Sequence, residues 1–254
     1  MMNNLILLFY PVVNVIVTGL FAGVVLRQYI QRHRLYQLYW AMALMMAFVA
    51  TLAYVGMIFA QPTSDVGILF FRLYYILGGA LTAAWLGLGS IALVTSRRVT
   101  WICLVVLCVL SALAVVLISI AGVDRQALRL IAGTPGTSIL QPPEGAWLYT
   151  IIVLNALGSV AVVGVAVYSG WKLKRRQGTS GLLWANVLIL TGAVMIALAG
   201  TTARLGVKNI FWLIMALGWT VFFIGVLMAS RPRSHAVPEK KEGQDQKKHN
   251  HASV

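Results

Sequence analysis

The chain has 254 residues, of which 60% are hydrophobic and only 10% charged, and its formal net charge is +14. Its mean hydropathy is +0.86, well above that of water-soluble domains, so the composition excludes an ordinary soluble fold. Several apolar runs reach the roughly 20 residues that a helix needs to cross about 30 Å of hydrocarbon. The period-two alternation of a membrane barrel is absent, so we expect helical spans, which satisfy their backbone hydrogen bonds internally.

Seven apolar runs predict an all-α integral membrane protein with seven transmembrane helices. The first run has neither the charged start nor the cleavage site of a secretory signal, so we expect it to be a permanent helix. Residues 1–230 would then form one transmembrane domain, and residues 231–254 a disordered basic tail. The predicted spans, in chain order, cover residues 4–26, 36–60, 68–95, 101–122, 146–171, 182–203 and 209–230.

Basic residues are distributed unevenly among the connections between these spans. The segments RQYIQRHR, SRRVT and KLKRR, together with the tail, contain fifteen of the 20 Lys and Arg residues. With seven spans all four segments lie on one side, which the positive-inside rule assigns to the cytoplasm. We therefore expect a bacterial cytoplasmic-membrane protein with its amino terminus outside and its carboxyl terminus in the cytoplasm. The basic side is expected to contact anionic lipids, and no basic soluble fold indicates a nucleic-acid partner.

The third span carries small residues at intervals of four. Gly79, Ala83 and Gly87 form a stripe that allows close approach of another helix in lipid, so we expect this span to be central in the bundle. A similar stripe, which also predicts helix packing, lies in the sixth span at Ala193, Ala197 and Thr201.

Arg72 lies about one turn inside the expected outer end of the third span. From there its side chain can snorkel to the interface, and Asp65, seven residues earlier on the same face, is its expected partner. The alternative is that Arg72 and Arg204 converge in an outer pocket and recognise an anionic group. Tyr75 belongs to the aromatic side chains expected at the same depth.

Two patterns recur in the first and second halves of the chain. Asn14 and Asn155 are each followed by a glycine nine residues later, and FRLYYILGG from Phe71 matches FWLIMALGW from Phe211 at four positions. A parallel repeat of two three-helix units, joined by the fourth helix, accounts for both patterns. Chance matches among abundant leucines and glycines account for them equally well. In a repeat, the two asparagines would be equivalent polar groups inside the membrane.

The predicted spans contain few residues that could hold a metal or perform catalysis. No Asp or Glu lies inside a span, and the Cys103 and Cys108 side chains point to different faces of one helix. We therefore expect no cofactor, no metal site and no enzymatic activity. All four histidines lie outside the spans: His33, His235, His249 and His251.

The run FRLYYILGGALTAAWLGLG, followed by a loop with paired arginines, resembles uncharacterised multi-pass membrane proteins of bacteria. This resemblance covers the helical bundle and implies no particular function. The topology is similar to that of the rhodopsins by analogy alone. A retinal protein resembling the microbial rhodopsins would carry a lysine within the seventh helix, whereas Lys208 precedes that span.

These features favour a binding or interaction protein over an enzyme. We expect a sensor-like or accessory module that recognises a small molecule or a partner protein through its outer half, with a membrane protein or a second copy as partner. The alternative is a small transporter of two three-helix units with its site between the halves. In the long loop at 123–145, the stretch AGTPGTSILQPPEG has turn residues at both ends of a short apolar piece, which predicts a small hairpin or a folded-over cap. The candidate ligand-binding residues are Arg72, Arg204, Asn14, Asn155 and Tyr75.

Overall fold

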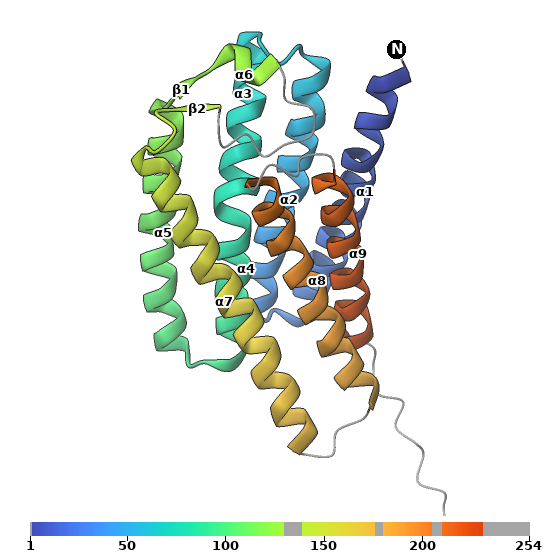
Figure 1. The fold of residues 1–254 in the computed structure, drawn as a ribbon. Helices are drawn as coiled ribbons and strands as arrows, with labels where there is room; N and C mark the ends of the chain where they lie inside the picture. Colours follow the sequence, from blue (N-terminus) through green and yellow to red (C-terminus); the bar gives the residue numbers. More distant parts are fainter. Residues whose placement is uncertain (1, 130–138, 176–179, 205–209, 231–254) are drawn as a thin grey trace, which may run out of the picture.

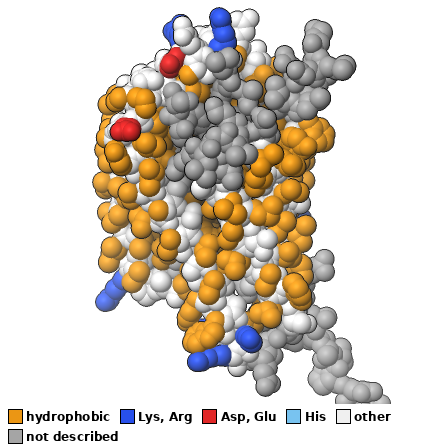
Figure 2. Space-filling model, in the orientation of Figure 1, with side chains coloured by type: hydrophobic (Ala, Val, Ile, Leu, Met, Phe, Trp, Pro, Cys, Tyr) orange, Lys and Arg blue, Asp and Glu red, His pale blue; other side chains and the backbone are white. Residues whose placement is uncertain are grey.

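A computed structural model of the chain describes residues 2–129, 139–175, 180–204 and 210–230, with the backbone alone at 2–7 and 202–204. Seven of its helices are long and apolar enough to cross a membrane. They lie side by side in one bundle (Figure 1), and hydrophobic side chains cover the flank that faces the viewer (Figure 2). The prediction of an all-α fold with seven candidate membrane spans is therefore confirmed. The predicted tail at 231–254 lies outside the described residues.

The third span consists of three consecutive helical segments. These are α3 (Asp65–Tyr74), the π-helical segment η1 (Tyr75–Leu81) and α4 (Thr82–Val94). The other elements in chain order are α1 (Met2–Arg32), α2 (Leu35–Phe59), α5 (Arg97–Ile120), β1 (Gly122–Val123), α6 (Arg125–Arg129), β2 (Leu140–Gln141), α7 (Ala146–Arg175), α8 (Ser180–Arg204) and α9 (Phe211–Ser230).

Two helices extend further into the basic segments than the apolar runs predicted. Helix α1 continues to Arg32 and α7 to Arg175, because neither segment contains a glycine or proline that would interrupt a helix before those residues. Helix α1 ends at Arg32, and the next residue, His33, has a left-handed φ of 47°. We call the end of the bundle where α1 and α7 finish in basic residues the basic end.

A small cap covers the opposite end of the bundle, where β1 pairs antiparallel with β2 (Figure 1). The sequence predicted a small hairpin or a folded-over cap for the loop after α5, and the structure shows two short strands paired at its ends, with residues 130–138 outside the described residues. Between the strands, the Asp124 carboxylate accepts hydrogen bonds from the backbone N–H groups of Gln126 and Ala127, at 2.8 and 3.1 Å. A carboxylate at this position satisfies backbone donors at the start of the short helix α6. We call the end of the bundle that carries β1, α6 and β2 the cap end.

Six of the seven spans form a closed ring. Going round it, α1 packs on α2, α2 on the third span, the third span on α7, α7 on α8, α8 on α9, and α9 on α1. Helix α5 lies outside the ring, against α4, η1 and α7. The third span has the largest buried share of the seven candidate spans, 56% of its most apolar window, although it is one member of the ring.

The small residues of the third span allow one very close helix crossing. At Gly87, an added Cβ would lie 2.8 Å from the Cα of Gly158 on α7. The packing predicted from the glycine stripe is therefore confirmed at Gly87. An aromatic cluster forms the contact between the first and last helices of the bundle, where Phe21 on α1 contacts Trp219 and Phe222 on α9.

Candidate functional site

A cavity of about 440 Å³ lies inside the ring, bounded by α2, the third span, α7, α8 and α9. Most of its wall consists of small, aliphatic and aromatic side chains. No charged side chain is among the described residues that line it. Polar groups are contributed by Thr51, Tyr74, Tyr75, Thr82, Asn155, Ser159 and Thr201.

The π-helical segment η1 forms one wall of this cavity. Two side chains donate to its backbone carbonyls. The Thr82 hydroxyl donates at 2.7 Å to the Leu77 carbonyl, which also accepts from the Thr82 backbone N–H, and the Asn155 amide donates to the Gly79 carbonyl at 2.7 Å. Such π-helical turns within longer helices are frequent at functional sites. Asn155, a predicted site residue, therefore joins α7 to the irregular turn and also lines the cavity.

The cavity has its mouth between α7 and α8. Four of the lining residues are exposed, and they come from these two helices: Ile152 and Ala156 on α7, and Ala197 and Thr201 on α8. The lining residues on α2, η1, α4 and α9 are buried or half-buried. The stripe in the sixth span was predicted to pack against a helix, but Ala193, Ala197 and Thr201 line the cavity instead.

Trp212 at the start of α9 is a cavity residue that the sequence did not single out. Its side chain is 5% exposed, and its Nε1–H has no hydrogen-bond acceptor among the described residues. Its ring packs against Tyr54 and Tyr74, with centroids 4.5 and 6.1 Å apart. The Nε1 atom itself has less than 1 Å² of accessible surface, and the indole N–H groups of Trp40 and Trp85 likewise lack acceptors among the described residues. Only the fold reveals that this donor is left without an acceptor.

Of the other predicted site residues, Tyr75 lines the cavity and Asn14 does not. Tyr75 lines the cavity and stacks on Phe71, with ring centroids 5.6 Å apart. Asn14 is 1% exposed and donates to the Trp212 carbonyl at 3.1 Å, but it does not line the cavity. The side chain of Arg204 lies outside the described residues, so its predicted convergence with Arg72 stays a prediction.

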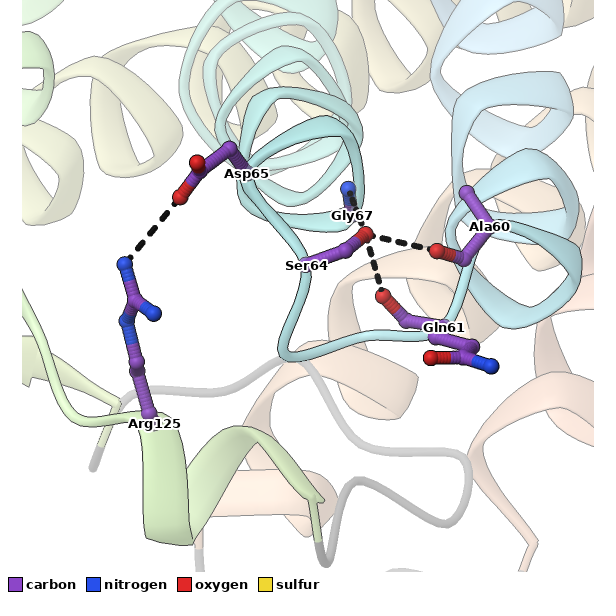
Figure 3. Close-up of polar contacts among 6 residues, drawn as sticks. All are labelled: Ala60, Gln61, Ser64, Asp65, Gly67 and Arg125. Carbon is purple, nitrogen blue, oxygen red and sulfur yellow. Dashed lines mark hydrogen bonds and ion pairs between the residues drawn. The ribbon is translucent and has the colours of Figure 1, made fainter.

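Arg72 and Asp65 do not pair, contrary to the prediction from their spacing. Figure 3 shows that the Asp65 carboxylate faces Arg125 of α6, and their charged groups are 3.1 Å apart. Asp65 begins α3 directly after Ser64, whose hydroxyl caps the helix by accepting from the Gly67 N–H at 3.0 Å. This position at the cap end brings Asp65 beside α6, while Arg72 lies two turns further along the helix.

Arg72 instead binds the end of α5. Its guanidinium donates to the Ala121 carbonyl at 3.0 Å, while its buried Nε has no partner among the described residues. The last carbonyls of a helix lack partners within the helix and carry partial negative charge, so a cation there is stabilising.

We expect Arg72→Met to lower the free energy of unfolding by about 2 kcal/mol, the scale of a hydrogen bond that involves a charged group. Arg72→Lys should lose roughly half as much, because lysine keeps the charge but lacks the planar fork. Chemical unfolding in detergent micelles measures both. Arg98→Met, at an exposed residue of the basic end, is the control. A change for Arg72→Met no larger than the control's would contradict this role.

Comparison of the chain with protein-family models, with curated proteins and with solved structures gave no match. The resemblance to bacterial multi-pass proteins therefore stays a prediction. Among the residues that the structure describes, no three His, Cys, Asp or Glu side chains are grouped as metal ligands.

Proposed function

We propose that this protein is a membrane-embedded binding module, sensor-like or accessory to a partner protein, that holds a small molecule inside its helix ring. The observation that carries this proposal is the cavity of about 440 Å³, with a π-helical turn in its wall. Protein interiors are normally packed as densely as organic crystals. Pockets for small molecules have volumes of about 300–1,000 Å³ and mostly apolar walls with a few polar groups.

The π-helical turn supports the sensor-like part of the proposal. The Gly79 carbonyl in η1 is held by Asn155 of α7, across the cavity wall. A ligand that contacts both sides of this hydrogen bond would stabilise one register of the third span over another. A ligand shifts a conformational equilibrium only if it binds one conformation more tightly than the other.

Filling the cavity should remove the bound molecule. We expect Ala193→Phe, which adds a ring to the cavity wall, to abolish binding, whereas Val194→Phe should leave binding unchanged. Val194 is the next residue on α8, is 38% exposed and does not line the cavity. The measurement is native mass spectrometry of each variant purified from membranes. Equal amounts of co-purified small molecule in the two variants would refute the proposal.

Transport is the second candidate function, and the ring of helices favours it. Asn14 in the first helix of one three-helix unit donates to Trp212 of the other unit, and Asn155 in the first helix of the second unit donates to Gly79 of the first. The two hydrogen bonds join corresponding pairs of helices in a parallel repeat, but at different levels, because the aligned patterns pair Trp212 with Arg72 and Gly79 with Trp219. Saturable flux of a co-purified molecule across vesicles, lost in Asn155→Leu, would favour transport. Binding without flux would favour the sensor-like module.

We also propose that the basic end faces the cytoplasm and anionic lipids. The last turn of α7 contains the basic residues Lys172, Lys174 and Arg175. The Arg175 guanidinium lies 4.0 Å from the centre of the Trp171 ring. Such residues near a membrane surface attract anionic lipid at roughly 1 kcal/mol each. With Cys103 and Cys108 replaced by serine, a cysteine introduced by Lys174→Cys should react with a membrane-impermeant thiol reagent only after the cells are opened. Reaction in intact cells would reverse the orientation.

A further inference from the structure

We infer that the ligand of this cavity is an uncharged amphiphile with a hydrogen-bond-accepting head group, and that it reaches the cavity sideways from the bilayer, between α7 and α8. This inference rests on the proposed binding function and specifies its ligand and its route. It depends on three observations: the depth of the mouth, the absence of charge in the wall, and the unsatisfied donor of Trp212.

The depth of the mouth follows from the positions of its residues in the two helices. Ala156 is ten residues from the start of α7, or about 15 Å along the helix. Ala197 is seven residues from the end of α8, or roughly 10 Å. In a bundle that spans about 30 Å of hydrocarbon, both residues lie at the level of the lipid chains, while the other two exposed lining residues, Ile152 and Thr201, lie closer to the cap end.

The surface around the mouth has the composition of a lipid-facing surface. The neighbouring exposed side chains are Val153, Leu157 and Val160 on α7, and Val194 and Leu198 on α8. A mouth surrounded by such residues opens onto hydrocarbon rather than onto water. A molecule dissolved in the bilayer therefore meets this opening directly.

The wall of the cavity sets the charge of the ligand. No Asp, Glu, Lys, Arg or His is among the described lining residues, so a charged ligand would lose its hydration without gaining an opposite charge. Burying an unpaired charge in this way is strongly unfavourable. The ligand is therefore neutral, and its larger part is apolar.

Trp212 sets the chemistry of the head group. The Trp212 side chain lines the cavity near the cap end, and its indole Nε1–H has no acceptor among the described residues. This atom has less than 1 Å² of accessible surface, so a ligand oxygen reaches it after a small rotation of the ring. An indole N–H can only donate, so the group that satisfies it must be an acceptor such as a hydroxyl, ketone or ester oxygen. Further from the cap end the wall becomes apolar, with Leu86, Val162 and Phe222.

Three isotope-labelled probes with the same chain test the ligand class: tetradecanol, tetradecane and tetradecyl sulfate. Each is partitioned between lipid nanodiscs that contain the protein and empty nanodiscs. We expect tetradecanol to be enriched on the protein, tetradecane less so and tetradecyl sulfate not at all. Trp212→Phe should weaken tetradecanol binding roughly fivefold and leave tetradecane unchanged. Binding of the sulfate as tight as that of the alcohol, or equal loss of alcohol and alkane in Trp212→Phe, would overturn the inference.

Blocking the mouth tests the route. In the double variant Ala156→Trp with Ala197→Trp, uptake of tetradecanol from donor vesicles should slow at least about tenfold, since binding then requires a conformational change. Leu157→Trp with Leu198→Trp is the matched control, because Leu157 and Leu198 are exposed beside the mouth without lining it. If the tryptophan pair misfolds, Ala156→Leu with Ala197→Leu takes its place. Equal uptake in blocked and control variants would overturn the bilayer route.

Failure of the inference can be told apart from failure of the proposed function. If the parent protein carries a co-purified molecule that is charged, the binding function stands and the neutral ligand class is wrong. If it carries no molecule and binds none of the three probes, the binding function itself is wrong. If tetradecanol is taken up from detergent-free water as fast as from vesicles, the ligand class stands and the route through the bilayer is wrong.

Discussion

Gly158→Leu should prevent stable packing of α7 against α4, with a loss of roughly 3 kcal/mol or more. A Cβ at this glycine would collide with the Ala83 carbonyl and lie 2.6 Å from the Ala84 backbone nitrogen. Backbone atoms cannot rotate away as a side chain can, so the two helices would have to separate. The variant should be recovered at low yield and should unfold at much lower denaturant concentration in detergent micelles.

Gly164→Leu on the same helix is the control for this prediction. An added Cβ at Gly164 has no atom within 4 Å, so the larger side chain is expected to point into lipid without displacing a helix. Similar losses of stability in the two variants would mean that glycine matters through backbone flexibility rather than through the close crossing. Normal stability of Gly158→Leu would contradict the geometry of the α4 and α7 contact.

Phe21→Ala should be the second strongly destabilising change, at about 4 kcal/mol. The Phe21 side chain is 1% exposed, and its ring lies against Phe222 and Phe223 with centroids 5.5 and 4.9 Å away. Its removal leaves a void where α1 meets α9, and in a bilayer helix association depends on such packing. Unfolding followed by tryptophan fluorescence measures the loss.

Leu20 provides the matched comparison on the same helix. It precedes Phe21 and is 59% exposed, so Leu20→Ala should change stability by no more than about 0.5 kcal/mol. A loss in Leu20→Ala as large as that in Phe21→Ala would indicate that this face of α1 is buried against a second chain. That result would make the partner or second copy, rather than the aromatic cluster, the main source of stability.

The number of spans could be predicted from the sequence because length and apolarity alone determine it. The ends of α1 and α7 could not, since Arg27, Arg32 and Lys172 add charge without interrupting a helix. Spacing suggested that Asp65 pairs with Arg72, but distance along one helix takes no account of α6, which supplies Arg125 from another part of the chain.

The candidate site was harder to predict than the spans. The π-helical register of η1 depends on contacts from other elements, such as the Asn155 hydrogen bond to Gly79, so local sequence preference does not encode it. Small residues in a membrane helix indicate close packing and a cavity wall equally well. Gly87 proved to be at a helix crossing, whereas Ala193 lines the cavity.

A high-resolution structure determined by electron cryomicroscopy in lipid nanodiscs is the most direct test of a ligand cavity inside the helix ring. We expect an open space between η1, α7 and α9, with density for a bound molecule that reaches Trp212 and passes Asn155. The mouth between Ala156 and Ala197 should face the lipid. Helices α7 and α8 packed together along their whole length, with Ser159 and Ala193 in contact and no space beside Gly79, would contradict a ligand cavity.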